Sequence, residues 1–306
     1  MYDLLIIGGG PGGVSAGVYA ARKKLKTILF AKEFGGASVV SDGIENWIGT
    51  IKISGLDLAQ NLKNHLLAYA GDSLTVKEGE SVLGITKSDS HFLVTTSKES
   101  YETKTILIAT GSDRRKLDVP GAKELEHRGL TYCASCDGPL FTGRDVAVVG
   151  GGNAALESAA QLLAYCKTVT LVNRSERLKG DEVTIEKLMK NDKFTILKNA
   201  IPLEVKGDKL VTGFVYEDAV TKEKHELAVS GIFVEIGLLP ATGLVKDLVK
   251  LNQIGQIIVD PRTQASSEPG IWAAGDCTDG LYHQNNIAAG DAVKALEDIY
   301  LYINTR

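Results

Sequence analysis

Residues 4–13 read Leu-Leu-Ile-Ile-Gly-Gly-Gly-Pro-Gly-Gly. The four apolar residues form a short continuous run, which is typical of a parallel strand buried on both faces. The run leads into Gly8-x-Gly10-x-x-Gly13, a helix-compatible segment and a second apolar run at residues 27–30. In such a turn, Gly8 permits the tight bend, Gly10 lets a pyrophosphate approach the backbone, and Gly13 lets the helix lie close to the sheet. The stretch therefore predicts a dinucleotide-binding unit.

The same pattern returns in the middle of the chain. A strand at residues 146–149 leads into Gly150-x-Gly152-x-x-Ala155, a helical segment and a strand at residues 169–172. One such motif is weak evidence for a nucleotide site. Two copies, each between a strand and a helix, are strong evidence, because two ordinary glycine turns would have to acquire the same surroundings by chance. Two sites predict two nucleotides, and a flavin with a nicotinamide is the economical pair because one passes hydride to the other.

Composition and charge narrow the class of protein. The 306 residues suggest two domains, and 44% hydrophobic with 24% charged residues is ordinary for a soluble globular chain. A net charge of −4 gives no electrostatic reason to expect a nucleic acid or an anionic membrane as partner. No apolar run approaches the roughly 20 residues of a spanning helix, and the first run is too short for a signal peptide. We therefore expect a cytoplasmic protein without membrane contact.

The remaining segments suggest how the domains are arranged. Residues 74–108 contain short β-rich runs that we interpret as an antiparallel meander ending at Ala109, and residues 194–234 are again β-rich. Val119-Pro120-Gly121 is a breaker and the best candidate for a domain boundary. Residues 286–303 have the apolar spacing of an amphipathic helix.

If the C-terminal tail returns to the first domain, that domain is discontinuous. The predicted division is 1–116 plus 242–306 for an FAD-binding domain, with 117–241 inserted as an NAD(P)-binding domain that carries a cysteine pair.

Cys133-x-x-Cys136 is a candidate redox dithiol, since such a pair can cycle between dithiol and disulfide. A helix start would favour a thiolate, and the adjacent Asp137 could move protons. Structural zinc would need a second ligand pair that the sequence does not offer, so no metal is expected. Two inert buried cysteines are the other alternative. We interpret Cys166 as a packing residue and favour the same for Cys277, which lies near the expected flavin site.

With these residues in view, essentially the whole chain resembles the low-molecular-weight thioredoxin reductases and the related flavoprotein subunit of alkyl hydroperoxide reductase. The resemblance rests on the two glycine turns, the 133–138 block just before the second turn, Ala109-Thr110-Gly111, residues 236–240 and Ala273-Ala274-Gly275-Asp276-Cys277. It implies an α/β fold with two Rossmann-like, three-layer ββα dinucleotide-binding domains of the FAD/NAD(P)-linked disulfide reductase type. The chain begins at once with the flavin strand, so an external disulfide protein is expected to take the electrons.

The resemblance also implies roles for particular residues. Cys136 would face the flavin, Cys133 would attack the disulfide of thioredoxin or a glutaredoxin-like protein, and Asp137 would donate the proton, in a homodimeric NADPH-type thioredoxin-disulfide reductase. The FAD site would comprise Gly8, Gly10, Pro11, Gly12, Gly13, Phe30, Ala31, Lys32, Gly35, Gly36, Ala37, Asn46, Val82, Ala109, Thr110, Gly111, Gly275, Asp276, His283, Gln284 and Asn285. The NAD(P) site would comprise Gly150, Gly152, Asn153, Ala154, Glu157, Asn173, Arg174, Lys179 and Gly237.

Three positions depart from the family pattern. Phe30 stands where an acidic residue often binds the ribose, and Ala37 stands where a glutamine is usual. Asn173-Arg174 replaces both the basic cluster of NADPH-type members and the strand-end glutamate of NADH-type members. Arg174 and Lys179 could hold a 2′-phosphate or could be solvated surface charges, and with no carboxylate to repel the phosphate we favour NADPH over NADH.

Other functions stay open at this point. The chain could serve a peroxiredoxin system with NADH, or ferredoxin could feed the flavin instead of a nicotinamide. A non-catalytic dinucleotide or redox sensor is the alternative outside the enzymes, and the dithiol argues against it.

Overall fold

A computed structural model describes residues 1–41, 43–44, 46–88 and 90–305, apart from the side chains of Val40, Ser135 and Cys136. The chain divides into two compact units: unit 1 is Met1–Asp113 with Leu239–Arg306, and unit 2 is Arg114–Leu238. These boundaries lie three residues before the expected ones. The breaker at residues 119–121 lies inside unit 2, where the Pro120 carbonyl accepts a hydrogen bond of 2.9 Å from the Val205 N–H.

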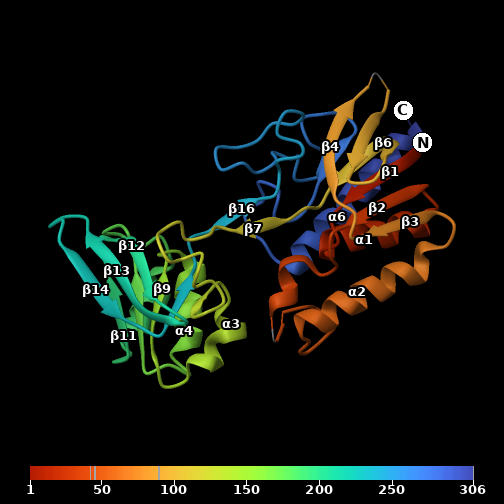
Figure 1. The fold of residues 1–306 in the computed structure, drawn as a ribbon. Helices are drawn as coiled ribbons and strands as arrows, with labels where there is room; N and C mark the ends of the chain where they lie inside the picture. The colour runs from red at the N-terminus through yellow and green to blue at the C-terminus, as the bar shows by residue number, and fades with distance from the viewer. Residues whose placement is uncertain (42, 45, 89, 306) are drawn as a thin grey trace. The chain divides into compact units, whose positions relative to one another are not determined.

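The main sheet of unit 1 has the strand order β3-β2-β1-β6-β5-β4, and β17 also pairs with β6 (Figure 1). β1, β2, β3, β6 and β17 are joined in parallel, while β4 and β5 continue the sheet in antiparallel fashion from β6. The strands are β1 (Tyr2–Ile7), β2 (Thr27–Ala31), β3 (Leu74–Glu78), β4 (Val82–Lys87), β5 (Phe92–Thr96), β6 (Ser100–Ile108) and β17 (Ile271–Ala273). The predicted meander is therefore wrong for residues 74–78, which join the parallel part of the sheet beside β2.

Both faces of this sheet are buried, as a continuous apolar strand requires. On β1, Leu4 and Ile6 enter one hydrophobic cluster, and Leu5 and Ile7 enter the cluster on the opposite face. The period-2 alternation of a strand thus divides one apolar run between two cores.

Three helices belong to unit 1: α1 (Pro11–Arg22), α2 (Gly55–Ala70) and α6 (Asn285–Thr305), with the short 3₁₀ helix η1 (Gly36–Val40). Pro11 begins α1, where its missing N–H costs no hydrogen bond. α6 packs against α1 and contributes Ala292, Ala295, Leu296 and Ile299 to the same core (Figure 1). The C-terminal tail therefore returns to unit 1.

Unit 2 contains a five-stranded parallel sheet in the order β11-β10-β9-β15-β8 and a three-stranded antiparallel sheet in the order β12-β13-β14 (Figure 1). The parallel strands are β8 (Leu130–Thr131), β9 (Asp145–Val149), β10 (Thr168–Val172), β11 (Phe194–Leu197) and β15 (Gly231–Val234). The antiparallel strands are β12 (Ala200–Gly207), β13 (Val211–Asp218) and β14 (Lys224–Ala228). The helices are α3 (Ala134–Asp137), η2 (Gly138–Phe141), α4 (Asn153–Leu162) and α5 (Glu182–Met189).

The chain passes between the units in two short strands, β7 (Ser112–Arg114) and β16 (Leu238–Pro240), which form a two-stranded sheet. Inside unit 2 the Arg115 N–H donates to the Gly237 carbonyl at 3.0 Å, and inside unit 1 the Ala241 N–H donates to the Gly111 carbonyl at 3.0 Å. In the described part of the chain, no helix combines the length and apolar character needed to span a bilayer.

Candidate functional site

The glycine turn of unit 1 is shaped by close backbone contacts at the carboxyl end of β1. A Cβ on Gly8 would clash with the Ala109 carbonyl oxygen after β6, and a Cβ on Gly13 would clash with the Gly8 carbonyl oxygen. These two glycines therefore bring the start of α1 against the ends of β1 and β6. Such an edge is where open parallel sheets bind ligands.

The helices that follow the two glycine turns begin without side-chain caps. No side chain of the described residues caps α1 at Gly10 or α4 at Gly152, and neither helix has an acidic residue in its first turn. By contrast, Ser54 caps α2 and Asp181 caps α5. The first N–H groups of α1 and α4 thus remain available for an anion, as a pyrophosphate-binding turn requires. The residues present fit a dinucleotide at both turns.

Side chains predicted for the FAD site meet next to the start of α6. The Asn46 side-chain amide donates to Gln284 Oε1 at 2.9 Å, and the Ser38 hydroxyl donates to Asn285 Oδ1 at 2.8 Å. His283 Nδ1 lies 3.6 Å from Asp276 Oδ1. Sequence reasoning missed Ser38, because nothing in its local pattern indicates a partner so far along the chain.

The other predicted FAD residues lie on six segments of unit 1. Gly10, Pro11 and Gly12 lie at the start of α1, and Ala31 with Lys32 at the end of β2. Thr110 donates through its hydroxyl to the Ala241 carbonyl at 2.7 Å. Val82 begins β4 and packs against the cluster that contains Phe30. The remaining positions are Gly35, Gly36 and Ala37 at η1, Gly111 after β6, and Gly275 after β17.

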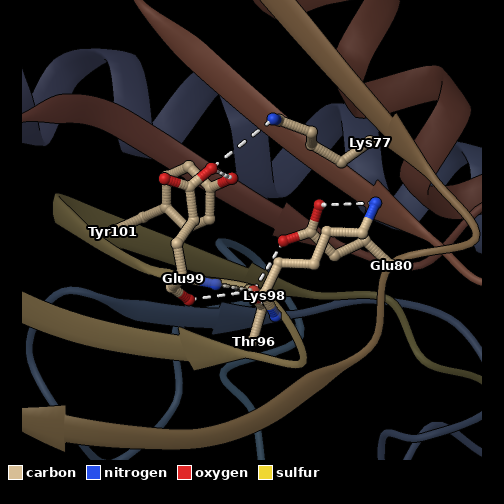
Figure 2. A network of polar contacts seen from close by, with 6 residues as sticks. All are labelled: Lys77, Glu80, Thr96, Lys98, Glu99 and Tyr101. Atoms are coloured by element: carbon tan, nitrogen blue, oxygen red, sulfur yellow. Dashed lines mark hydrogen bonds and ion pairs between the residues drawn. The ribbon is translucent and has the colours of Figure 1, made fainter.

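Only the backbone of Phe30 is available to the predicted FAD site. Its side chain is buried, its ring centroid lies 5.2 Å from that of Tyr101, and its carbonyl accepts the Gly8 N–H at 2.9 Å. Tyr101 belongs to a polar network, shown in Figure 2, in which its hydroxyl donates to Glu99 and the Thr96 hydroxyl donates to the buried Glu80 at 2.5 Å. Tyr101 of this network packs against Phe30, and Glu80 connects the network to the segment before β4.

The glycine turn of unit 2 joins the end of β9 to α4. A Cβ on Gly150 would clash with the Glu235 carbonyl oxygen, so the turn lies directly against the end of β15. Asn153 Oδ1 accepts the Asp181 N–H at 2.7 Å, and the Gly151 carbonyl accepts the Lys179 N–H at 2.7 Å. The N–H groups of Lys179 and Asp181 therefore hold residues 179–181 against this turn.

Asn173, Arg174 and Lys179 lie in the loop after β10, but their side chains differ in what they can do. The Asn173 amide nitrogen donates to the Ser175 carbonyl at 2.5 Å and to the Arg177 carbonyl at 3.2 Å, and Asn173 is buried. The side chains of Arg174 and Lys179 are exposed. The amide of Asn173 thus stabilises the loop itself, while three cations of the loop, Arg174, Arg177 and Lys179, lie at its surface. Ala154 and Glu157 are exposed on α4, and Gly237 follows β15 beyond Glu235.

Cys133 is disulfide-bonded and lies between β8 and α3. Its N–H donates to the Thr131 hydroxyl at 3.3 Å, and the Thr131 hydroxyl in turn donates to Asp137 Oδ2. The Cys136 side chain, which the sequence analysis paired with Cys133, lies outside the described part of the structure. α3 is a single turn of four residues, so its dipole is too small to favour a thiolate strongly, unlike the helix start expected from the sequence.

The other two cysteines are free and buried. Burial raises the pKa of the Cys166 thiol to about 11 and that of the Cys277 thiol to about 11. Both are therefore inert packing residues at neutral pH, as the sequence predicts.

Two units that each carry a dinucleotide-type turn, one of them holding a disulfide, define a class of nucleotide-dependent disulfide enzymes. The chain belongs to the pyridine nucleotide-disulphide oxidoreductase family, whose sequence pattern matches residues 2–292. Membership implies binding of FAD and of a nicotinamide dinucleotide. The resemblance and the fold class predicted from the sequence are confirmed.

Individual relatives refine this picture. The chain is 34% identical to thioredoxin reductase of Lactococcus lactis, with a TM-score of 0.85 and 99% of each chain covered. It is 35% identical to thioredoxin reductase of T. acidophilum, with a TM-score of 0.81 and coverage of 98% and 97%. It is also 41% identical over 295 residues to a subunit of the alkyl hydroperoxide reductase of Pseudomonas putida, a match that covers 96% of this chain but 56% of the relative. The chain thus spans little more than half the length of that curated relative.

Proposed function

We propose that this chain is an FAD-dependent protein-disulfide reductase. It would pass hydride equivalents from NAD(P)H through FAD to a Cys133–Cys136 disulfide, and on to thioredoxin or a glutaredoxin-like protein. The observation that carries the proposal is a disulfide-bonded cysteine in the same unit as an uncapped dinucleotide turn. Bound flavin would supply the chemistry that converts a hydride into electrons for a disulfide.

The residues of each unit have distinct roles in this proposal. The uncapped start of α1 holds the FAD pyrophosphate, and the Asn46, Gln284 and Asn285 cluster closes the same edge. The uncapped start of α4 holds the nicotinamide dinucleotide. In unit 2, Cys133 attacks the partner disulfide, and Asp137, whose carboxylate accepts the Thr131 hydroxyl, is the group that transfers the proton.

NADPH is the proposed donor. The strand-end residue Asn173 carries no charge, and its amide is already bonded within its own loop. The exposed cations Arg174 and Lys179 can meet a 2′-phosphate, and no carboxylate occupies the strand end to repel it. Turnover compared with NADPH, NADH and reduced ferredoxin tests this choice, and failure of both nicotinamides would contradict it.

A second candidate is a flavoprotein reductase of a peroxide-reducing system. It is favoured by the 41% identity to the alkyl hydroperoxide reductase component of Pseudomonas putida. The two candidates share the flavin and the dithiol and differ in the disulfide protein that takes the electrons, so parallel assays with thioredoxin and with a thioredoxin-like module of a peroxide reductase separate them.

The central experiment compares Cys133→Ser and Cys136→Ser with Cys166→Ser, a matched change at a buried cysteine of the same unit. We expect purified protein to be yellow and NADPH to bleach the flavin in all variants, whereas thioredoxin reduction should fall below about a thousandth of wild type in the first two. Full-rate thioredoxin reduction by Cys136→Ser would refute the assignment.

A further inference from the structure

A buried carboxylate outside the predicted site lies at the carboxyl edge of the unit 2 sheet. Glu235 directly follows β15, and its N–H donates to the Val149 carbonyl at 2.8 Å, so it lies beside the glycine turn. Its side chain is only 11% exposed. Oε1 accepts the Ser158 hydroxyl of α4 at 2.8 Å, and Arg114 Nη1 lies 3.3 Å from each carboxylate oxygen.

Arg114 connects this carboxylate to the disulfide segment. The same Nη1 that contacts Glu235 also donates to the Tyr132 carbonyl, one peptide unit before Cys133. One nitrogen of this guanidinium, on a side chain that is 40% exposed, therefore contacts both a nearly buried anion and the backbone that leads into the disulfide. Arg114 and Glu235 are therefore placed to act on Cys133 together.

Nearby charges affect how far Glu235 compensates the positive charge of Arg114. Burial raises the pKa of Glu235, and the Glu157 charge adds to that effect, while Arg114 and Ser158 oppose it. Near Tyr132, Lys116 and Glu126 form an ion pair of their own. In this setting Glu235 partly neutralises the cation that Arg114 brings to the Cys133 backbone.

We propose that Arg114 and Glu235 form a charge pair that sets how readily the Cys133 disulfide is reduced, with Arg114 favouring the reduced form and Glu235 opposing it. The inference rests on the proposed function, in which this disulfide is redox-active. A cation near a cysteine stabilises its thiolate, and a stabilised thiolate makes the disulfide more easily reduced. Removing the cation and removing its counter-anion should therefore act in opposite directions.

The test equilibrates the holoenzyme anaerobically with mixtures of reduced and cyclic oxidised dithiothreitol. The protein disulfide takes up two electrons and two protons as one dithiothreitol is oxidised to its ring form. Quenching with acid, alkylation and mass spectrometry give the reduced fraction of Cys133. This readout needs neither NADPH nor a protein partner.

The variants are Arg114→Met, Glu235→Gln, the double variant, and Arg128→Met as a control that removes an exposed cation elsewhere in unit 2. We expect the equilibrium constant for reduction to fall about threefold to tenfold in Arg114→Met and to rise by a similar factor in Glu235→Gln. The double variant should return close to wild type, because it leaves no unpaired buried charge.

Equal constants in all variants, or shifts of the same sign in both single variants, would overturn the proposal. Loss of folding in Arg114→Met alone does not mask the result, since the double variant and Glu235→Gln still report the sign. Failure of the proposed function would be seen separately, as a wild-type protein whose flavin NADPH does not bleach.

Discussion

The two glycine turns have the same order of elements, yet the chain encloses the first and leaves the second open. In unit 1, Pro11, Gly12 and Gly13 are buried, and the Ala288 carbonyl oxygen would lie 3.2 Å from a Cβ on Gly12. In unit 2, the equivalents of Pro11 and Gly12 are Asn153 and Ala154, and both are exposed, while Ala155 at the position of Gly13 is buried.

This difference in enclosure matches two kinds of nucleotide. A site walled by backbone on several sides suits a group that stays bound through many turnovers, whereas an open turn suits a reagent that binds and leaves in each cycle. The third position of the motif follows the same trend: unit 1 has Gly13 where unit 2 has Ala155. A Cβ is tolerated at the open turn and would clash at the enclosed one.

The largest effect is expected from Gly13→Ala. The new Cβ would clash with the Gly8 carbonyl, and neither backbone can retreat, so we expect a loss of more than about 3 kcal/mol in the free energy of unfolding and loss of bound flavin. Thermal unfolding and flavin absorbance measure both. The matched change Ala155→Gly in unit 2 should cost about 1 to 2 kcal/mol, through helix propensity and the loss of one buried methyl group. A Gly13→Ala protein with normal flavin content would refute the enclosure argument.

Cys166 in unit 2 and Cys277 in unit 1 are both buried, and both should be far less reactive than reduced Cys133. With a pKa of about 11, roughly a thousandth of the Cys166 or Cys277 thiols is ionised at pH 8. We expect alkylation at least about 100-fold slower than that of Cys133 after mild reduction, with a tenfold rise per pH unit below pH 11. Peptide mass spectrometry over time gives these rates, and fast labelling of Cys277 in folded protein would contradict its burial.

A smaller effect is expected from Gly152→Ala. Because its Cβ meets no described atom, folding should change by less than about 0.5 kcal/mol, while the methyl group obstructs the approach of a pyrophosphate. We expect the KM for NADPH to rise about tenfold with flavin content unchanged. The corresponding Gly10→Ala in unit 1 should instead lower flavin content. If both variants changed the same quantity, either flavin content or the KM for NADPH, the two turns would not bind different nucleotides.

The smallest effect is expected from Lys179→Ala. Removing one exposed cation from the loop after β10 should raise the KM for NADPH about threefold to fivefold and leave that for NADH unchanged. Steady-state kinetics with both nucleotides measures the ratio, and Lys187→Ala, which removes an exposed charge on α5, is the control. Equal changes in the KM for NADPH and for NADH would show that Lys179 does not bind the 2′-phosphate.

The sequence predicts best the features that close-range sterics determine. The two turns are visible because glycines a few residues apart bend the backbone at the end of an apolar run, and those runs then form the centres of two sheets. β3 was misassigned because a five-residue, half-buried run has the same pattern in parallel and antiparallel sheets. Its partner is determined by the crossover through α2.

Features that depend on the folded backbone were not predictable. The family resemblance assigned Asn173 to the nicotinamide site, and only the folded loop shows that its amide donates to the carbonyls of residues 175 and 177. Arg114 and Glu235 are 121 residues apart in the sequence. Their pairing arises from the arrangement of β7 and β15, which no local pattern encodes.

The neighbouring crossings of β7 and β16 have a practical consequence for protein engineering. Because Arg115 is bonded to Gly237, and Gly111 to Ala241, the cut ends of each unit lie side by side. Residues 114–238 could therefore be expressed as a free-standing fragment, and a short glycine linker could rejoin the flanking halves into a miniature flavin protein. The interruption of unit 1 by unit 2 along the chain could thus be removed in the laboratory.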